Sequence, residues 1–229
     1  MKGKKRSKKM VVLFSIIGFV VICVATVVST SLYIANPTKG VAITRSNDPK
    51  SALLVIDVQN DITGNTGVYK NTAEFVERVN HTVSIAEEHG MEILYVKNIY
   101  GNNPIITLLS GGRFKKGTDG AEFDSNLYVV NSNVFVKSIG DSFSSIAFDE
   151  YLISRNVDTL YIIGADAAGC VYNTARGGLN RNYNVSIIKD SIITRNDDIM
   201  AQMLNQYEKD GIAVIDLTKF DEFCSTIST

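Results

Sequence analysis

The stretch Ala52-Leu53-Leu54-Val55-Ile56-Asp57-Val58-Gln59-Asn60-Asp61 joins five consecutive apolar residues to a carboxylate and further polar side chains. A short apolar run of this kind is typical of a strand that is buried on both faces, as in a parallel sheet. Similar runs recur along the chain, and helical patterns lie between them. The predicted strands are 52–56, 93–96, 134–136, 159–163, 185–188 and 212–215, and the predicted helices are 72–89, 146–153, 171–179 and 199–207.

This alternation of strands and helices indicates an α/β fold. Parallel strands joined by right-handed crossovers predict a three-layer α/β/α, Rossmann-like domain with a mainly parallel sheet. Residues 98–133 interrupt the alternation with five glycines. Because long irregular stretches in compact domains are usually functional or mobile, we expect this one to wall a site.

The N-terminal part of the chain has a different composition. Residues 10–28 carry no charge, and six Lys and Arg residues precede them. About 20 apolar residues cross a membrane as a helix, and cations on one flank indicate the cytoplasmic side. We therefore predict a basic cytoplasmic segment (1–9), a transmembrane signal-anchor helix (10–34), a linker (35–49) and an extracytoplasmic domain (50–229).

Cleavage of the apolar segment, followed by secretion, is the alternative to a retained anchor. The apolar core of a signal peptide usually has roughly 7–15 residues, and this run is longer. Ser29-Thr30-Ser31 offers only a mediocre cleavage site. The preferred interpretation is a single-pass protein of the cell membrane.

The charge balance and the cysteine content indicate which partners and which disulfides to expect. The chain has 23 Lys and Arg and 24 Asp and Glu residues, and six of the cations lie among the first nine residues, so the rest has a net charge of −7. Nucleic-acid binding needs a basic face, so no nucleic-acid partner is expected. The spacing of Cys23, Cys170 and Cys224 does not indicate a disulfide framework, and we expect free thiols.

Residues with complementary chemistry follow three of the predicted strands. Asp57 follows the first strand, Lys137 follows the third, and Cys170 follows the fourth after a loop of small residues. Ligands of open α/β sheets bind at the carboxyl ends of the strands, so these side chains should gather there. The start of a helix favours a thiolate at Cys170, Asp57 would take and return its proton, and Lys137 would balance the charges. Backbone N–H groups of the loop would form an oxyanion hole.

Each residue also has an ordinary structural interpretation. Cys170 would be a packed small residue, Lys137 a rim cation and Asp57 a cap. The combination favours catalysis, because three separate strand ends supply complementary roles.

Several motifs together resemble the isochorismatase-like cysteine hydrolases. They are Ile56 to Asp61, Lys116-Gly117-Thr118-Asp119-Gly120-Ala121-Glu122-Phe123, Lys137, Gly164 with Cys170-Val171 after five residues, and Thr174-Ala175-Arg176. The likeness covers roughly residues 51–217, which makes 50–229 an isochorismatase-like hydrolase domain.

This resemblance implies covalent thiol catalysis on small amides, ureas and related C–N bonds, without a cofactor. The triad would be Asp57, Lys137 and Cys170. The resemblance also implies a cis peptide bond between Ala165 and Asp166, oxyanion-binding N–H groups at Asp166 and Cys170, and a homo-oligomer.

Departures from the family pattern bear on metal and substrate. Nicotinamidases of this superfamily bind a metal through Asp-x-His and a second His after the second strand. Here that region has no histidine, and the only histidines, His81 and His89, lie on the first predicted helix of the domain, so no metal is expected. Ala167-Ala168 stands where Thr-Asp is frequent, which makes the pocket less polar. The substrate-pocket candidates are Gln59, Asp61, Asp141 and Phe143, and Asp141 is expected near the mouth of the pocket.

The preferred function is therefore a membrane-anchored cysteine hydrolase acting on a small amide or ureido substrate. Isochorismatase-type hydrolysis of a vinyl ether is an alternative, although such a substrate is expected in the cytoplasm. A non-catalytic binding module on the same fold is the other alternative.

Overall fold

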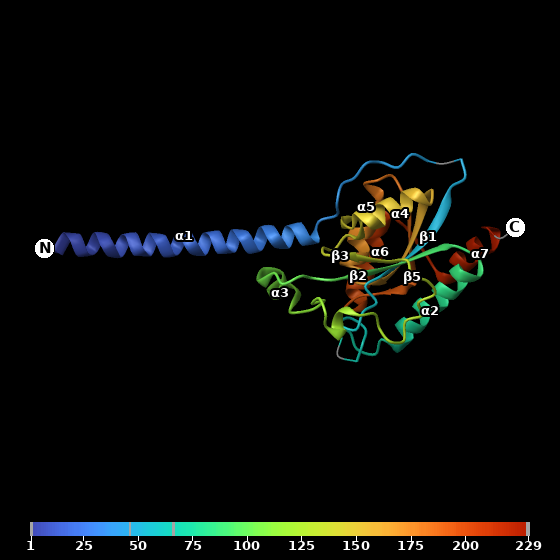
Figure 1. The fold of residues 1–229 in the computed structure, drawn as a ribbon, viewed down its shortest axis with the longest axis horizontal. Helices are drawn as coiled ribbons and strands as arrows, with labels where there is room; N and C mark the ends of the chain where they lie inside the picture. Colours follow the sequence, from blue (N-terminus) through green and yellow to red (C-terminus); the bar gives the residue numbers. More distant parts are fainter. Residues whose placement is uncertain (1, 46, 66, 228–229) are drawn as a thin grey trace.

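The computed structural model describes residues 2–45, 47–65 and 67–227. Helix α1 (Lys2–Ala35) projects away from an α/β domain, and a linker leads from its end across the domain to the first strand (Figure 1). Within α1, residues Met10–Ala35 have a mean hydropathy of 3.0 and are not buried against the rest of the chain. By length and composition this helix suits either a membrane span or a signal sequence.

The described residues of the domain form one six-stranded parallel sheet in the order β3-β2-β1-β4-β5-β6. The strands are β1 (Lys50–Ile56), β2 (Glu92–Asn98), β3 (Val134–Lys137), β4 (Val157–Ala165), β5 (Asn184–Ile193) and β6 (Ala213–Ile215). All six predicted strands are present, and the predicted α/β class with a parallel sheet is confirmed.

Helices cover both faces of this sheet. They are α2 (Ala73–Glu88), α4 (Ile146–Ser154), α5 (Cys170–Leu179), α6 (Asp197–Lys209) and α7 (Leu217–Ile227). Alternate residues of β1 point to opposite faces: Leu54 belongs to the core formed with α4, α5 and α6, and Leu53 belongs to the core formed with α2 and α7. Strand β1 is therefore buried on both faces, as its continuous apolar run predicts.

Residues 98–133 contain structure that the sequence did not reveal. A short helix, α3 (Pro104–Ser110), projects beside the end of α1, and a 3₁₀ turn, η1 (Asp119–Ala121), follows (Figure 1). A second 3₁₀ turn, η2 (Ser142–Ser144), comes after β3. Only part of 98–133 is thus irregular.

The end of α1 and the linker that follows it both form contacts with the domain. The carbonyl of Ile34 accepts a hydrogen bond from the Gly140 N–H at 2.9 Å, and the Ile43 N–H donates to the Arg181 carbonyl at 2.8 Å. Arg45 forms an ion pair with Asp158 at 3.3 Å. The sequence suggested a simple tether, whereas these contacts make the linker part of the folded unit.

Candidate active site

Asp57 and Lys137 meet at the carboxyl edge of the sheet. Asp57 directly follows β1, and Lys137 is the last residue of β3, two strands away. The Lys137 Nζ lies 2.8 Å from the Asp57 Oδ2, and both side chains are almost completely buried. Lys137 also donates to the carbonyl of Ile139 at 3.3 Å. A buried ion pair thus occupies the place where the sequence analysis expected the two residues to gather.

The backbone leaves β1 through an unusual conformation at Asp57. Its φ is 51°, in the left-handed region that residues other than glycine rarely adopt. Its N–H donates to Val96 at 3.0 Å, which keeps the residue attached to β2. Non-glycine residues in such conformations cluster at functional sites.

A close approach of two strands supports the same edge. Gly164 in β4 pairs with Ile56 and has a φ of 116°. A Cβ atom at this position would lie 2.1 Å from the Ile56 carbonyl oxygen. Only glycine therefore lets β4 and the loop to Cys170 come this close to Asp57.

Cys170 begins α5 and interacts with both members of the ion pair. Although the residue is partly exposed, burial of the thiol is the largest cause that raises its pKa to about 12, and the charge of Asp57 adds to this. The charge of Lys137 lowers the pKa by less. The helix start by itself favours the thiolate, whereas desolvation and Asp57 together raise the pKa of the thiol by more than the cation lowers it.

Lys137 carries its positive charge within this ion pair. Burial lowers the pKa of Lys137, but the charges of Asp57 and Cys170 and their hydrogen bonds raise it above its ordinary value overall. Lys137 is therefore a permanent cation at neutral pH. The Asp57 Oδ1 is buried without a hydrogen bond, while Oδ2 binds Lys137. Among the described residues, one oxygen of this carboxylate thus has no hydrogen-bond partner.

The loop before Cys170 contains the cis peptide bond between Ala165 and Asp166 that the resemblance implied. Among the described residues, the N–H groups of Asp166 and Cys170 donate no hydrogen bond, whereas those of Ala167 and Gly169 do. The carboxylate of Asp166 is held by the Tyr69 hydroxyl and by the Ala168 N–H. The oxyanion-binding role that the resemblance implies for these two N–H groups stays a prediction.

Gln59 and Asp61, two of the substrate-pocket candidates, form hydrogen bonds with a neighbouring segment of the chain. Gln59 is fully buried: its amide donates to the carbonyls of Asn98 and Ala121 and accepts from the Asn98 N–H. Asp61 accepts a hydrogen bond from the Phe114 N–H at 2.6 Å. These side chains join the loop after β1 to the segment 98–121, which they hold in place.

The other two candidates, Asp141 and Phe143, are buried. Asp141 is 0% exposed, so it is not at the mouth of a pocket. One of its carboxylate oxygens accepts from the N–H and hydroxyl of Thr38 at 2.7 Å each, and the other accepts from the Phe143 N–H. Burial is the main cause that raises the pKa of this carboxyl. Phe143 packs in the core against Phe148. The linker therefore binds the domain at Asp141, through Thr38.

Asn98 and Tyr100 are polar neighbours of the triad that the sequence analysis did not select. Asn98 lies opposite Lys137 in the sheet, and its Nδ2 donates to the Tyr100 hydroxyl at 3.1 Å. Its Oδ1 is buried without a partner. Burial raises the pKa of Tyr100, as do the charges of Cys170 and Asp57, while Asn98 and Lys137 lower it. Their position after the second predicted strand is the only signal in the sequence that indicates a place at this site.

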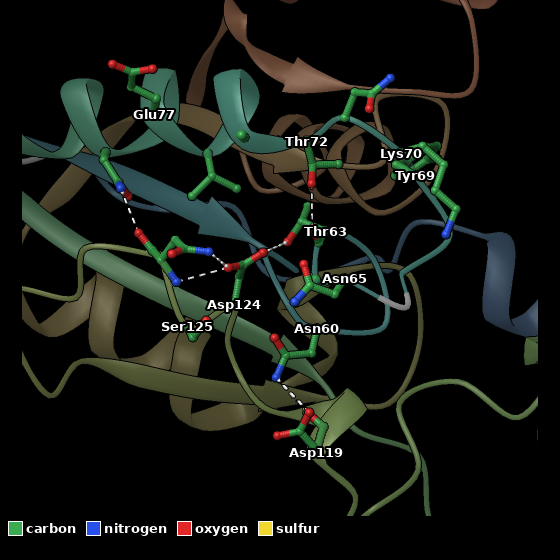
Figure 2. A pocket seen from close by; sticks show the side chains of 16 residues that line it. Asn60, Thr63, Asn65, Tyr69, Lys70, Thr72, Glu77, Asp119, Asp124 and Ser125 are labelled. Atoms are coloured by element: carbon green, nitrogen blue, oxygen red, sulfur yellow. Dashed lines mark hydrogen bonds between the residues drawn. The ribbon is translucent and has the colours of Figure 1, made fainter.

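An open pocket of about 780 Å³ lies nearby, between the loop after β1 and the start of α2. Figure 2 shows its polar wall, where the Thr63 hydroxyl donates to Asp124 and the Asn60 amide donates to the Asp119 carbonyl. None of Asp57, Lys137 and Cys170 lines it. Tyr69 connects the two regions, because it lines the pocket and binds Asp166.

With this geometry established, similarity to known proteins identifies the family. The family model described as the isochorismatase domain matches residues 51–219. The chain belongs to the isochorismatase family. A relative from Bacillus subtilis strain 168, the uncharacterised isochorismatase family protein YrdC, is 22% identical over 184 residues, which are 80% of this chain and 94% of the relative.

Solved structures of family members share the fold. An isochorismatase family protein from Desulfovibrio vulgaris is 25% identical with a TM-score of 0.69, covering 78% of this chain and 100% of that one. N-carbamoylsarcosine amidase from Thermoplasma acidophilum is 25% identical with a TM-score of 0.65, covering 73% and 96%. A pyrazinamidase of Pyrococcus horikoshii in complex with zinc is 22% identical with a TM-score of 0.66, covering 74% and 100%. The domain therefore has the fold of the isochorismatase-family hydrolases.

The residues beyond β2 do not fit a zinc ion. Zinc prefers His, Cys and carboxylate ligands, whereas Asn98 offers an amide and Tyr100 a phenol that its raised pKa keeps protonated. Within 2–45, 47–65 and 67–227, no three His, Cys, Asp or Glu side chains are arranged to hold a metal.

Proposed function

We propose that this protein is a cysteine hydrolase that cleaves a C–N bond of a small amide or ureido compound. The observation that carries the proposal is the buried Asp57–Lys137 ion pair beside the Cys170 thiol. N-carbamoylsarcosine amidase and pyrazinamidase are among the proteins with the same fold, which supports this substrate class.

In the proposed reaction, the Cys170 Sγ attacks the substrate carbonyl while the thiol proton passes to the Asp57 Oδ1. The N–H groups of Asp166 and Cys170 stabilise the negative charge on the carbonyl oxygen. The intermediate collapses as the C–N bond breaks, and Asp57 returns the proton to the leaving nitrogen. Water then hydrolyses the thioester with Asp57 as base, which releases the acid and restores the thiol.

Lys137 has an electrostatic role in this scheme. Its ammonium group binds the Asp57 carboxylate and offsets the negative charge that develops at the sulfur. The raised pKa of Cys170 is compatible with this order of events, because the proton leaves only as the new S–C bond forms.

We also propose that the protein is anchored in a membrane. Helix α1 is long and apolar enough to span a bilayer, and we propose that it is a retained anchor with the basic N-terminus in the cytoplasm. The hydrolase domain would then act outside the cytoplasm. Protease added to intact cells should remove the domain, and protection until lysis would contradict this topology.

The chemistry is tested with the full chain in detergent micelles. Primary amides and N-carbamoyl compounds should release ammonia or amine, and denaturation during turnover should trap an acyl group on the Cys170 peptide, detectable by mass spectrometry. Turnover of a vinyl ether alone would favour the isochorismatase alternative. Binding without turnover, with no acyl adduct, would favour the non-catalytic module.

A further inference from the structure

Helix α3 exposes an apolar face that the rest of the domain does not cover. Asn103 caps its start by accepting hydrogen bonds from the N–H groups of Ile105 and Ile106, and Gly111 ends it with a φ of 64°. None of its residues is buried, and Leu108 is 74% exposed. Because short helices are marginal in water unless an apolar face is packed, this well-capped helix is suited to a further apolar partner.

The position of α3 indicates what that partner is. Figure 1 shows α3 beside the domain-proximal end of α1, and the two helices are in contact. The hydrogen bond between Gly140 and Ile34 fixes the end of α1 to the domain. Exposed leucines of α3 and the exposed apolar residues of α1 therefore lie on adjacent helices.

The length of α1 sets the depth of this region. Its apolar part, Met10–Ala35, has 26 residues, and at 1.5 Å per residue it is about 39 Å long. The hydrocarbon core of a bilayer is about 30 Å thick, so the last turns would reach the headgroup layer. Tyr33, on the last turn, is exposed, and tyrosine is enriched at this depth. Exposed Lys115 and Lys116 follow α3, and they suit the phosphate groups of the same layer.

We propose that α3 inserts Leu108 and Leu109 into the lipid–water interface of the membrane that α1 spans. This inference rests on the anchor in the proposed function and adds a second membrane contact to it. The base of the α3 segment is closed by the Tyr100 N–H, which donates to the Phe114 carbonyl at 2.7 Å. Since Tyr100 is a neighbour of the triad, the bilayer would hold one wall of the candidate active site.

The chain contains no tryptophan, so single tryptophans can report depth. The full chain would be reconstituted into phosphatidylcholine–phosphatidylglycerol vesicles with bromine near the headgroup end of the acyl chains. Leu108→Trp is the reporter, and Leu109→Trp replaces it if the first variant does not fold. Leu13→Trp reports on α1 itself. Ile153→Trp is the matched control, because Ile153 is 55% exposed on α4, near the opposite, amino edge of the sheet.

The expected result is that brominated lipid quenches the tryptophans at positions 108 and 13 at least twofold, while acrylamide in water quenches only the one at 153. Quenching at 13 without quenching at 108 would overturn this inference and leave the anchor intact. Absence of quenching at both positions would overturn the anchor and this inference together. Quenching at 153 equal to that at 108 would also overturn it, because the contact would not be specific to α3.

Discussion

The Lys137 ammonium binds one oxygen of the Asp57 carboxylate at 2.8 Å and leaves the other oxygen without a partner. Burial and this same carboxylate raise the pKa of the Cys170 thiol to about 12. In the proposed mechanism, this pair does not ionise the thiol in advance. It would provide an acceptor for the proton when the sulfur attacks.

Loss of any triad member should abolish turnover. We expect Cys170→Ser, Asp57→Asn and Lys137→Met each to lower kcat by about 10⁴-fold or more, with strong non-additivity in the double variants. Steady-state kinetics on the best amide of the panel measures this. Cys23→Ser, which changes a thiol in α1, is the control and should leave kcat unchanged. Full activity of Cys170→Ala would rule out the mechanism.

The reactivity of Cys170 should depend on its two charged neighbours in opposite directions. Because Asp57 raises the pKa of the thiol and Lys137 lowers it, Asp57→Asn should shift the pH profile of alkylation to lower pH, and Lys137→Met should shift it to higher pH. The thiolate forms as pH rises through the pKa, so the wild-type rate should still increase above pH 10. Iodoacetamide labelling followed by peptide mass analysis measures the rate at Cys170. An alkylation midpoint below pH 8 in the wild type would contradict the buried, carboxylate-paired thiol.

Loss of one member of the buried ion pair should lower the free energy of unfolding more than loss of both charges. Lys137→Met leaves an uncompensated buried carboxylate, and we expect it to lower the free energy of unfolding by about 3–5 kcal/mol. Adding Asp57→Asn removes that charge, so the double variant should recover part of the loss. Urea unfolding of a fragment that begins at Asn36 measures both. A double variant that is less stable than Lys137→Met would show that the charges do not act as a pair.

The linker should contribute to stability. Thr38→Val removes a hydroxyl that donates to the buried Asp141 carboxylate and accepts from Arg181, and a loss of about 1–3 kcal/mol is expected. Thr44→Val, at an exposed linker position, is the matched control. A fragment beginning at Asn47 should also have a lower Tm than one beginning at Asn36. Equal melting temperatures for the two fragments would mean that the linker is a passive tether.

The Tyr100 hydroxyl should help to position the substrate. Tyr100→Phe keeps the ring contact with Phe114 but removes the hydroxyl beside the triad, so we expect kcat/KM to fall about 5–10-fold, the value of about one hydrogen bond. Tyr128→Phe, which changes a tyrosine whose hydroxyl binds Glu87 on the surface, should have no effect. If both variants behave alike, the role of Tyr100 is structural only.

Sequence reasoning was most successful where a single physical signal dominates. Strand β1 followed from its uninterrupted apolar run, and the meeting of Asp57 with Lys137 followed from their positions at strand ends. The burial of Asp141 was not predictable, because it depends on Thr38, which lies 103 residues earlier in the chain. The raised pKa of Cys170 was missed for a similar reason: the local helix start favours the thiolate, and only the tertiary structure supplies the opposing desolvation and charge.

The contacts of Thr38 also have a consequence for the order of synthesis. Its partners Asp141 and Arg181 lie 103 and 143 residues later in the sequence. The linker emerges from the ribosome long before the residues that bind it are synthesised. During translation the linker would therefore stay undocked, and its docking would come only after α5 has formed. Resistance of the linker to proteolysis would thus mark the completion of folding in the nascent chain.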